Sequence, residues 1–448
     1  MRPLLAILAT ALLPLTAAAQ PARTADCATT TARADFDGDG VDDVVAGDPF
    51  ADVRGLTGAG AVQVVSGRGA TALAALEPAA GDGFGWSVAL ARVDSDACAD
   101  LLVGVPYADV AGRRDAGAVH ILYGGTKRGT VLVAPEPQQD AHFGWSLARD
   151  SENGTAVAIG APYEDDGDVP DAGAVYLFGG GTTALVRITQ ESDGVPGSSE
   201  AGDLFGWAAA LGRLSGERGP ADLAVGSPYE NDDGAGRQAG QGMADTGGLT
   251  VVDDPLDAGG RYTGRRWGMP DLVGPAEARQ APGDRFGHAL AYADGMLAVS
   301  APLADAAGTR DTGLVHLLRP GLRQGTTFHR GSGPGDAFGF SLALTATGQD
   351  GVRLAVGIPL AGPDDRGAVQ VIPLDAPGQA TLLTAPQSRP GDHFGWSVAF
   401  SGNRLAAGIP DAPGGGALAL LGRMRGAFTM PPPASPGLPT DIGASLGG

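Results

Sequence analysis

The stretch Phe84-Gly85-Trp86-Ser87-Val88-Ala89-Leu90 opens a unit that recurs along the whole chain. It is followed by an apolar segment ending in Gly104-Val105-Pro106, and then by a segment that starts Gly117-Ala118-Val119. Phe-Gly recurs with its phenylalanine at residues 84, 143, 205, 286, 338 and 394. The Gly-x-Pro-like turn recurs seven times, ending at Pro49, Pro106, Pro162, Pro228, Pro302, Pro359 and Pro410. The chain therefore consists of seven copies of one unit.

The periodicity inside the unit predicts β-strands. Phe84, Trp86, Val88 and Leu90 alternate with small residues, and a period of two is typical of a strand. Further strands are expected at 101–104, 118–123 and 130–134. Successive Gly-x-Pro turns lie 51 to 74 residues apart, which is enough for four short strands and their turns. We predict an all-β fold, a seven-bladed β-propeller of four-stranded antiparallel blades, because a closed repeat array protects its sheet edges.

The pattern of Phe-Gly followed by a Gly-Ala-Pro-like turn resembles the FG-GAP repeat. This repeat builds the N-terminal propeller of integrin α-subunits and occurs in secreted bacterial proteins of the FG-GAP/VCBS repeat family. The resemblance covers about residues 27–430. It implies a propeller that carries calcium in its hairpin loops and ligand contacts on one face.

The two ends of the chain do not belong to the repeat. Arg2, an apolar run from Leu4 to Leu15 and Ala17-Ala18-Ala19 predict a secretory signal peptide at 1–19, cleaved after Ala19. No later run is long enough to insert into a membrane, so we expect secretion and a propeller over 20–430. Residues 431–448 form either a tail or a closing strand. Ile442-Gly443-Ala444-Ser445-Leu446 resembles the start of a unit, whereas the Pro431-Pro432-Pro433 run favours a tail.

The net charge limits the classes of partner, and the two cysteines raise the question of a disulfide. A formal net charge of −21 argues against nucleic acid and anionic membranes as partners. Cys27 and Cys98 are the two cysteines, and a disulfide is typical of an exported protein. The repeat register, however, places Cys27 at the top of a strand and Cys98 in a loop at the opposite end. The sequence therefore leaves the pairing open.

The acidic stretch 35–43 predicts a calcium loop. Asp35, Asp37, Asp39 and Asp43 can converge because Gly38 and Gly40 allow the backbone to wrap. Hard oxygen ligands at this spacing suit Ca²⁺, and without a cation the carboxylates would repel each other. By resemblance to the integrin-type hairpin loop, these four side chains and the backbone carbonyl of Val41 would bind the ion. An ion-free Asp/Gly-rich hairpin is the alternative.

The second copy has a poorer version of this loop. It keeps Asp94, Asp96 and Asp100, but Arg92 replaces the first acid. A weak second metal loop is one interpretation, and an arginine paired with Asp94 or Asp96 is the other.

The loops after the Gly-x-Pro turns are candidates for a ligand face, and so is an insertion in the fourth copy, predicted at Asp253–Gln280. They contain acids and aromatic or basic residues of the types found at interfaces. A solvated loop crown and a folded-back insertion are the alternatives. The candidates are Tyr107, Tyr163, Glu164, Tyr229, Glu230, Arg265 and Trp267.

No catalytic set is evident in the sequence. Five of the six histidines, His120, His142, His288, His316 and His393, occupy repeat positions, and no nucleophile elbow or metalloprotease motif is present. We expect a secreted, monomeric, non-enzymatic module that binds Ca²⁺ and a protein or glycan ligand. The alternative is an extracellular hydrolase or lyase acting on polysaccharide or lipid.

Overall fold

The computed structural model describes residues 26–448 except 151, 153–154, 180–181, 217–218, 233–241, 258, 275, 330–332, 348–350, 422–427 and 430–441. The predicted signal peptide lies outside the described residues. Among the described residues, no helix has the length and apolarity to cross a bilayer.

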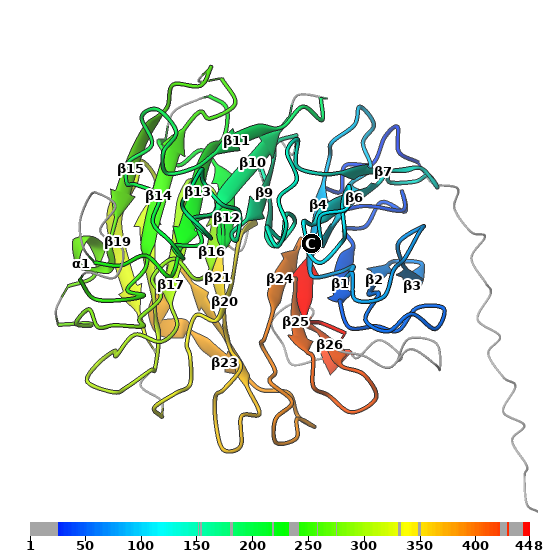
Figure 1. Cartoon of the computed structure of the whole chain (residues 1–448). Helices are drawn as coiled ribbons and strands as arrows, with labels where there is room; N and C mark the ends of the chain where they lie inside the picture. The colour runs from blue at the N-terminus through cyan, green and yellow to red at the C-terminus, as the bar shows by residue number, and fades with distance from the viewer. Residues whose placement is uncertain are drawn as a thin grey trace, which may run out of the picture.

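Seven four-stranded antiparallel sheets stand around a common axis, so the predicted seven-bladed propeller is confirmed (Figure 1). The first blade contains β28 (Ser445–Gly447), β1 (Val44–Asp48), β2 (Ala61–Ser66) and β3 (Gly69–Leu73). The second contains β4 (Ser87–Ala91), β5 (Asp100–Val105), β6 (Ala118–Leu122) and β7 (Gly129–Leu132). The third contains β8 (Leu147–Arg149), β9 (Val157–Ala161), β10 (Ala174–Phe178) and β11 (Val186–Ile188).

The remaining blades repeat this order from the axis outward. The fourth contains β12 (Ala208–Gly212), β13 (Asp222–Ser227), β14 (Gly248–Asp253) and β15 (Thr263–Trp267). The fifth contains β16 (Leu290–Ala293), β17 (Met296–Ala301), β18 (Leu314–Arg319) and β19 (Arg323–Phe328). The sixth contains β20 (Ser341–Thr347), β21 (Gly351–Ile358), β22 (Ala368–Pro373) and β23 (Thr381–Leu383). The seventh contains β24 (Val398–Ser401), β25 (Arg404–Ile409), β26 (Ala417–Leu421) and β27 (Phe428–Thr429). Two short helices, α1 (Met269–Leu272) and η1 (Pro377–Gln379), lie outside the blades.

The two halves of the repeat motif meet between neighbouring blades. A Cβ on Gly104, in the Gly-x-Pro turn of the second blade, would lie 2.1 Å from the carbonyl oxygen of Gly144, in the Phe-Gly pair of the third. The Ser87 hydroxyl donates a hydrogen bond of 2.7 Å to that same oxygen. The glycine is therefore required because the next blade's backbone occupies the space of a side chain. Five further blade pairs show the same approach, at Gly47, Gly160, Gly226, Gly357 and Gly408.

The core lies between the blades. The phenylalanine of every Phe-Gly pair is fully buried: Phe84, Phe143, Phe205, Phe286, Phe338 and Phe394. Val88 and Leu90 pack with Val45 and Val62 of the first blade, while Ala89 packs with Ile159 of the third. The large and small faces of the predicted inner strand therefore contact different neighbours.

The C-terminal segment closes the ring. β28 pairs antiparallel with β1, with Ala46 opposite Leu446 and Gly47 opposite Ser445. The Ser445 hydroxyl donates to the carbonyl oxygen of Gly85 at 2.7 Å, as Ser87 does to Gly144. The expectation of a tail is thus wrong for residues 442–448, because this segment supplies the inner strand of the first blade. Residues 430–441 lie outside the described part of the chain.

The presumed insertion after Asp253 is also corrected. Thr263–Trp267 is β15, the outer strand of the fourth blade, and Met269 and Leu272 of α1 are buried in the core of the fourth and fifth blades. The segment is therefore part of the repeat, with a longer loop before its outer strand.

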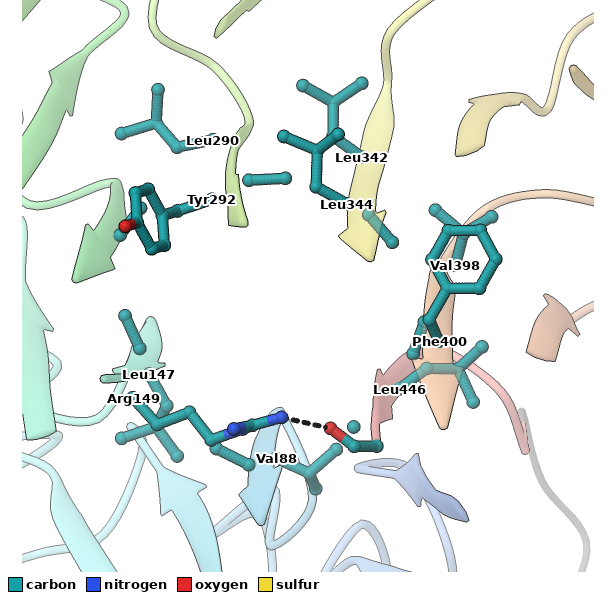
Figure 2. Close-up of a pocket in the computed structure, with 18 of the residues that line it drawn as sticks. Val88, Leu147, Arg149, Leu290, Tyr292, Leu342, Leu344, Val398, Phe400 and Leu446 are labelled. Carbon is teal, nitrogen blue, oxygen red and sulfur yellow. Dashed lines mark hydrogen bonds between the residues drawn. The ribbon is translucent and has the colours of Figure 1, made fainter. Parts of the chain in front are cut away.

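The seven inner strands surround an axial cavity of about 220 Å³ (Figure 2). Val88, Leu147, Leu290, Leu342, Val398 and Leu446 form an aliphatic belt around it. Below this belt the Arg149 guanidinium donates to the backbone oxygen of Gly448 at 2.9 Å. This bond ties the closing strand to the third blade.

Candidate functional site

The loop 35–43 precedes β1 and brings three of the four predicted ligand acids close together. Carboxylate oxygens of Asp35, Asp37 and Asp39 all lie within 4.8 Å of one another. Asp35 is buried, and its two oxygens accept four hydrogen bonds, from the backbone N–H groups of Gly38, Asp39 and Gly40 and from Thr30. Gly38 and Gly40 adopt positive φ, of 70° and 86°, which lets the loop wrap around Asp35.

Asp43 completes the loop and has an unusual environment. It is fully buried, and its Oδ2 accepts the N–H of Phe36 at 2.8 Å. Its Oδ1 is buried and has no hydrogen-bond partner in the described structure. Burial raises the pKa of Asp43 to about 7; the hydrogen bond from Phe36 lowers it, and the charges of the neighbouring loop aspartates add to the rise. A buried oxygen without a donor, beside three other carboxylates, is an environment that a bound cation would satisfy.

The equivalent carboxyl groups of the second and fourth blades have both oxygens satisfied. Asp100 accepts from Val93 and Asp94 at Oδ2 and from Gly124 at Oδ1. Asp222 accepts from Ser215 and Asp254. The second and fourth blades thus use this carboxylate as a hydrogen-bond acceptor on both oxygens, and the first blade differs from them by leaving one oxygen without a donor.

The donor set fits a hard divalent cation such as Ca²⁺. Asp35, Asp37, Asp39 and Asp43 would hold it with their side chains and Val41 with its backbone carbonyl. Arg68, in the β2–β3 turn, flanks this group: it donates to the carbonyl oxygen of Asp37 at 2.6 Å, and its guanidinium lies 3.5 Å from the Asp37 carboxylate. Arg68 therefore fixes the outer edge of the loop.

The second loop has a different network. Arg92 donates to the carbonyl oxygen of Ala32 at 2.7 Å, and no ion pair with Asp94 or Asp96 occurs among the described residues. Asp94 accepts the N–H of Asp96. Within the described chain, Asp94, Asp96 and Asp100 do not gather as Asp35, Asp37 and Asp39 do. The loop is therefore held by hydrogen bonds.

Cys27 and Cys98 form a disulfide, with Cα atoms 4.8 Å apart. Cys27 lies in a turn instead of a strand, because β28 occupies the strand position that the repeat register assigned to it. The geometric objection to the pairing therefore does not apply.

On the opposite face of the propeller, aromatic side chains surround the axis. They directly precede the inner strands and touch in sequence around the ring, with centroid separations of 4.6 to 6.0 Å. All are half-buried. We call this set the axial aromatic cluster; its members are Trp86, Trp145, Trp207, His288, Phe340 and Trp396. The seventh position is Ala444, in the closing segment, so the circle has one gap.

The tyrosines predicted for the ligand face adjoin this cluster. Tyr107, Tyr163 and Tyr229 lie 5.3 to 5.4 Å from Trp86, Trp145 and Trp207, respectively. The Arg285 guanidinium lies over the Tyr229 ring at 4.0 Å. Burial raises the pKa of Tyr163 to about 12, so its hydroxyl stays protonated at neutral pH. The sequence analysis identified these tyrosines but not the continuous cluster. The cluster could have been predicted from the aromatic residue that follows each Phe-Gly pair.

The two glutamates among the other ligand-face candidates are buried in ion pairs. Glu164 is buried and pairs with Arg187 at 2.6 Å. Glu230 is buried and pairs with Arg266 at 2.5 Å. Each glutamate lies in the loop between the second and third strands of its blade and connects that loop to the outer strand of the same blade. Arg265 is exposed and pairs with Asp253, whereas Trp267 packs against the core.

The histidines have structural surroundings. His120 packs edge-on against Phe84 at 5.4 Å, His316 contacts Thr327, and His142 contacts the carbonyl oxygen of Pro106. His288 lies between Trp207 and Phe340, where burial lowers its pKa to about 4. His393 lies 2.5 Å from the Asp411 carboxylate. The hydroxyl that His316 contacts belongs to Thr327 of the neighbouring strand β19.

Comparison with known proteins agrees with the repeat motif. Residues 28–65 and 84–122 match the model of the FG-GAP repeat, and residues 129–178 match a second FG-GAP repeat model. The chain is an FG-GAP repeat β-propeller. It resembles the integrin α type in both its repeats and its relatives.

Curated relatives match parts of this FG-GAP propeller. Integrin alpha-PS2 of Drosophila melanogaster is 33% identical over 220 residues, which is 44% of this chain and 15% of the relative. Integrin alpha-5 of Xenopus laevis is 32% identical over 158 residues, 33% of this chain and 14% of the relative. Phosphatidylinositol-glycan-specific phospholipase D of Rattus norvegicus is 28% identical over 171 residues, 35% of this chain and 20% of the relative. The matched part is thus a fifth or less of each relative's length.

Solved structures align only loosely with this propeller. A chain in the crystal structure of the mitotic checkpoint complex gives a TM-score of 0.46 at 11% identity, covering 81% of this chain and 82% of that one. The fold assignment rests on the blades themselves.

Proposed function

We propose that this FG-GAP propeller is a secreted, monomeric, non-enzymatic interaction module that binds a protein or glycan ligand and is stabilised by Ca²⁺ at Asp35–Asp43. The observation that carries the binding role is the axial aromatic cluster with its adjoining tyrosines. Half-buried tryptophan and tyrosine side chains offer a large contact area with little conformational entropy to lose, which is typical of binding surfaces.

The charges around this face support a binding role over a catalytic one. Glu164 and Glu230, which the sequence suggested for this face, are buried. Each forms an ion pair, Glu164 with Arg187 and Glu230 with Arg266. His288, inside the cluster, is kept neutral by burial. These three groups therefore have structural partners or surroundings, and what remains at the axis is mainly aromatic surface.

The binding role is tested with a displayed random-peptide library and a glycan array, both probed with the secreted protein. Ligands selected on the wild type should bind Trp145→Ala at least tenfold more weakly, because Trp145 contacts Trp86, Trp207 and Tyr163. Val131→Thr is the matched control, since Val131 is 52% exposed on the outer strand β7. Ligands that bind Trp145→Ala as tightly as the wild type would contradict the proposed face.

The similarity to phosphatidylinositol-glycan-specific phospholipase D supports a hydrolase as the second candidate. Incubation of the purified protein with phosphoinositide-glycan and polysaccharide substrates tests it directly. Product formation above the buffer blank, lost on substitution of acids at the loops of one face, would replace the binding proposal.

A further inference from the structure

We propose that the Cys27–Cys98 disulfide controls the cation affinity of the loop 35–43, so that reduction of this one bond weakens cation binding. This inference rests on the cation site proposed above. It concerns how that site is held in its binding conformation.

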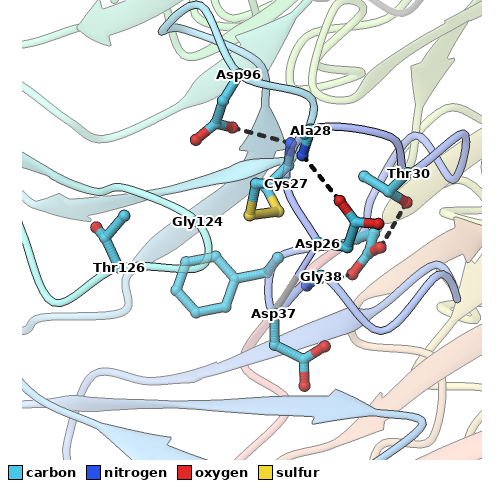
Figure 3. Close-up of a disulfide and its surroundings, with 12 residues drawn as sticks. Asp26, Cys27, Ala28, Thr30, Asp37, Gly38, Asp96, Gly124 and Thr126 are labelled. Carbon is cyan, nitrogen blue, oxygen red and sulfur yellow. Dashed lines mark hydrogen bonds between the residues drawn. A yellow bond between two sulfur atoms is a disulfide. The ribbon is translucent and has the colours of Figure 1, made fainter. Parts of the chain in front are cut away.

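The disulfide joins the segment 26–30, which precedes the cation loop of the first blade, to the neighbouring loop of the second blade (Figure 3). The residues on either side of Cys98 extend the connection. The N–H of Ala97 donates to the carbonyl oxygen of Cys27 at 2.7 Å, and the N–H of Ala99 donates to the carbonyl oxygen of Asp35 at 2.8 Å. Cys98 therefore lies between a contact to its own partner and a contact to the first acid of the loop.

The residues on either side of Cys27 hold the loop directly. The N–H of Asp26 donates to the carbonyl oxygen of Gly38 at 3.1 Å. The Thr30 hydroxyl donates to Asp35 Oδ2 at 2.6 Å (Figure 3). Asp26, Ala28 and Thr29 are exposed, so this short segment gains little from packing. The disulfide is the covalent link that keeps both of its contacts with the loop in place.

The coupling follows from these contacts. When the bond is reduced, the segment 26–30 can separate from the second blade. Asp35 then loses the Thr30 donor, one of the four to its carboxylate, and the Gly38 carbonyl loses the Asp26 N–H. Coupling between two sites is reciprocal at equilibrium. A cation held by the loop must therefore favour the oxidised form by the same factor by which the disulfide favours cation binding.

The reduction step needs a dithiol such as dithiothreitol. One of its thiolates attacks a sulfur of the bond, most accessibly that of the half-buried Cys27, to form a mixed disulfide. Its second thiol then displaces the protein thiol and closes the oxidised ring. Two electrons pass to the protein, and Cys27 and Cys98 become thiols.

The first test measures binding of Ca²⁺ and Tb³⁺ by titration calorimetry and Tb³⁺ luminescence. Cys27→Ser/Cys98→Ser should bind about tenfold or more weakly than the wild type, within the range usual for coupled sites. The cation affinity of Thr30→Ala should lie between those of the wild type and the double serine variant, since this change removes one contact to Asp35 and keeps the disulfide. Thr29→Ala should match the wild type, because Thr29 contacts Asp26 and no residue of the loop.

The second test uses the wild-type protein and needs no stable cysteine variant. Cys27 and Cys98 are the only cysteines in the chain, so thiol titration reports this bond alone. At a fixed ratio of reduced to oxidised dithiothreitol, saturating Ca²⁺ should raise the ratio of disulfide to dithiol protein by the factor found in the first test. Asp39→Asn should show a smaller shift.

The outcomes separate the two proposals. No cation binding by the wild type would overturn the cation site itself. Equal affinity in the wild type and the double serine variant, with no effect of Ca²⁺ on the thiol equilibrium, would overturn the coupling and leave the site standing.

Discussion

At the scale of single residues, one carboxylate distinguishes the first blade from the others. Asp43, Asp100 and Asp222 occupy equivalent positions at or directly before the start of the second strand of the first, second and fourth blades. Asp100 and Asp222 have backbone donors for both oxygens, whereas Asp43 Oδ1 has no partner in the described structure. A buried oxygen without a donor is costly, and a bound cation would remove that cost.

Asp43→Asn should abolish the stabilisation of the protein by Ca²⁺. We expect the wild type to gain about 2.7 kcal/mol of unfolding free energy when Ca²⁺ is at 100 times its Kd, because the ion binds only the native state. EDTA should reverse this gain. Calorimetric melting of the wild type and the variant, with and without Ca²⁺, provides the measurement.

Asp100→Asn is the matched control for that experiment. It should melt at a lower temperature than the wild type under all conditions, since both Asp100 oxygens accept hydrogen bonds, yet it should keep the full response to Ca²⁺. A wild-type melting temperature that EDTA leaves unchanged in metal-free buffer would contradict the cation site.

A second buried carboxyl predicts a pH dependence. Asp203 is buried, and burial followed by the charge of Glu230 raises its pKa from 3.8 to about 9. The folded state holds the Asp203 proton more tightly than the unfolded state does. The contribution of this proton to the free energy of unfolding is therefore complete below about pH 4 and declines as the pH rises towards 9. Asp203→Asn keeps an acceptor for the N–H of Glu200 and cannot ionise. Its melting temperature should therefore fall less between pH 6 and 9 than that of the wild type; parallel curves would refute this.

At the scale of the elements, the repeat motif works as an interlock between blades. The carbonyl oxygen of Gly144 occupies the space beside Gly104, and Ser87 donates a hydrogen bond to it. The Phe-Gly pair and the Gly-x-Pro turn that meet there belong to different blades. The two halves of the motif are thus complementary surfaces, which explains why they recur together.

Gly104→Ala should destabilise the protein by about 1–3 kcal/mol or more, because its Cβ would lie 2.1 Å from the Gly144 oxygen and force the blades apart. Gly378→Ala is the control: no atom lies within 4 Å of its added Cβ, and its φ is not in the left-handed region. Chemical denaturation should show the first variant weakened and the second unchanged or slightly stabilised. Equal stability of the two variants would show that the contact between Gly104 and Gly144 has room for a methyl group.

At the scale of the whole molecule, a short strand closes the ring. β28 completes the first blade, and three contacts tie it to other blades: Ser445 to Gly85, Gly443 to Ser397, and Gly448 to Arg149. The same strand leaves Ala444 in the circle of aromatic side chains, so closure and the shape of the aromatic face are linked.

Removal of residues 442–448 should open the ring. β1 would then present an unpaired edge next to apolar side chains, and such edges promote association. We expect a broader, less cooperative unfolding transition and higher oligomers in light scattering. A monomer that melts like the wild type would show that β28 is dispensable for closure.

The sequence by itself determined the number of blades, the four strands of the second blade and the acidic loop 35–43. Alternating apolar residues, glycines and closely spaced aspartates act over a few residues, so their effect can be recognised without knowing what lies across the ring. Only the tertiary structure decided that Cys27 meets Cys98, that residues 445–447 complete the first blade, and that Glu164 and Glu230 are buried in ion pairs. Each of these depends on which distant segment or neighbouring strand packs against a residue, and identical local patterns can have either outcome.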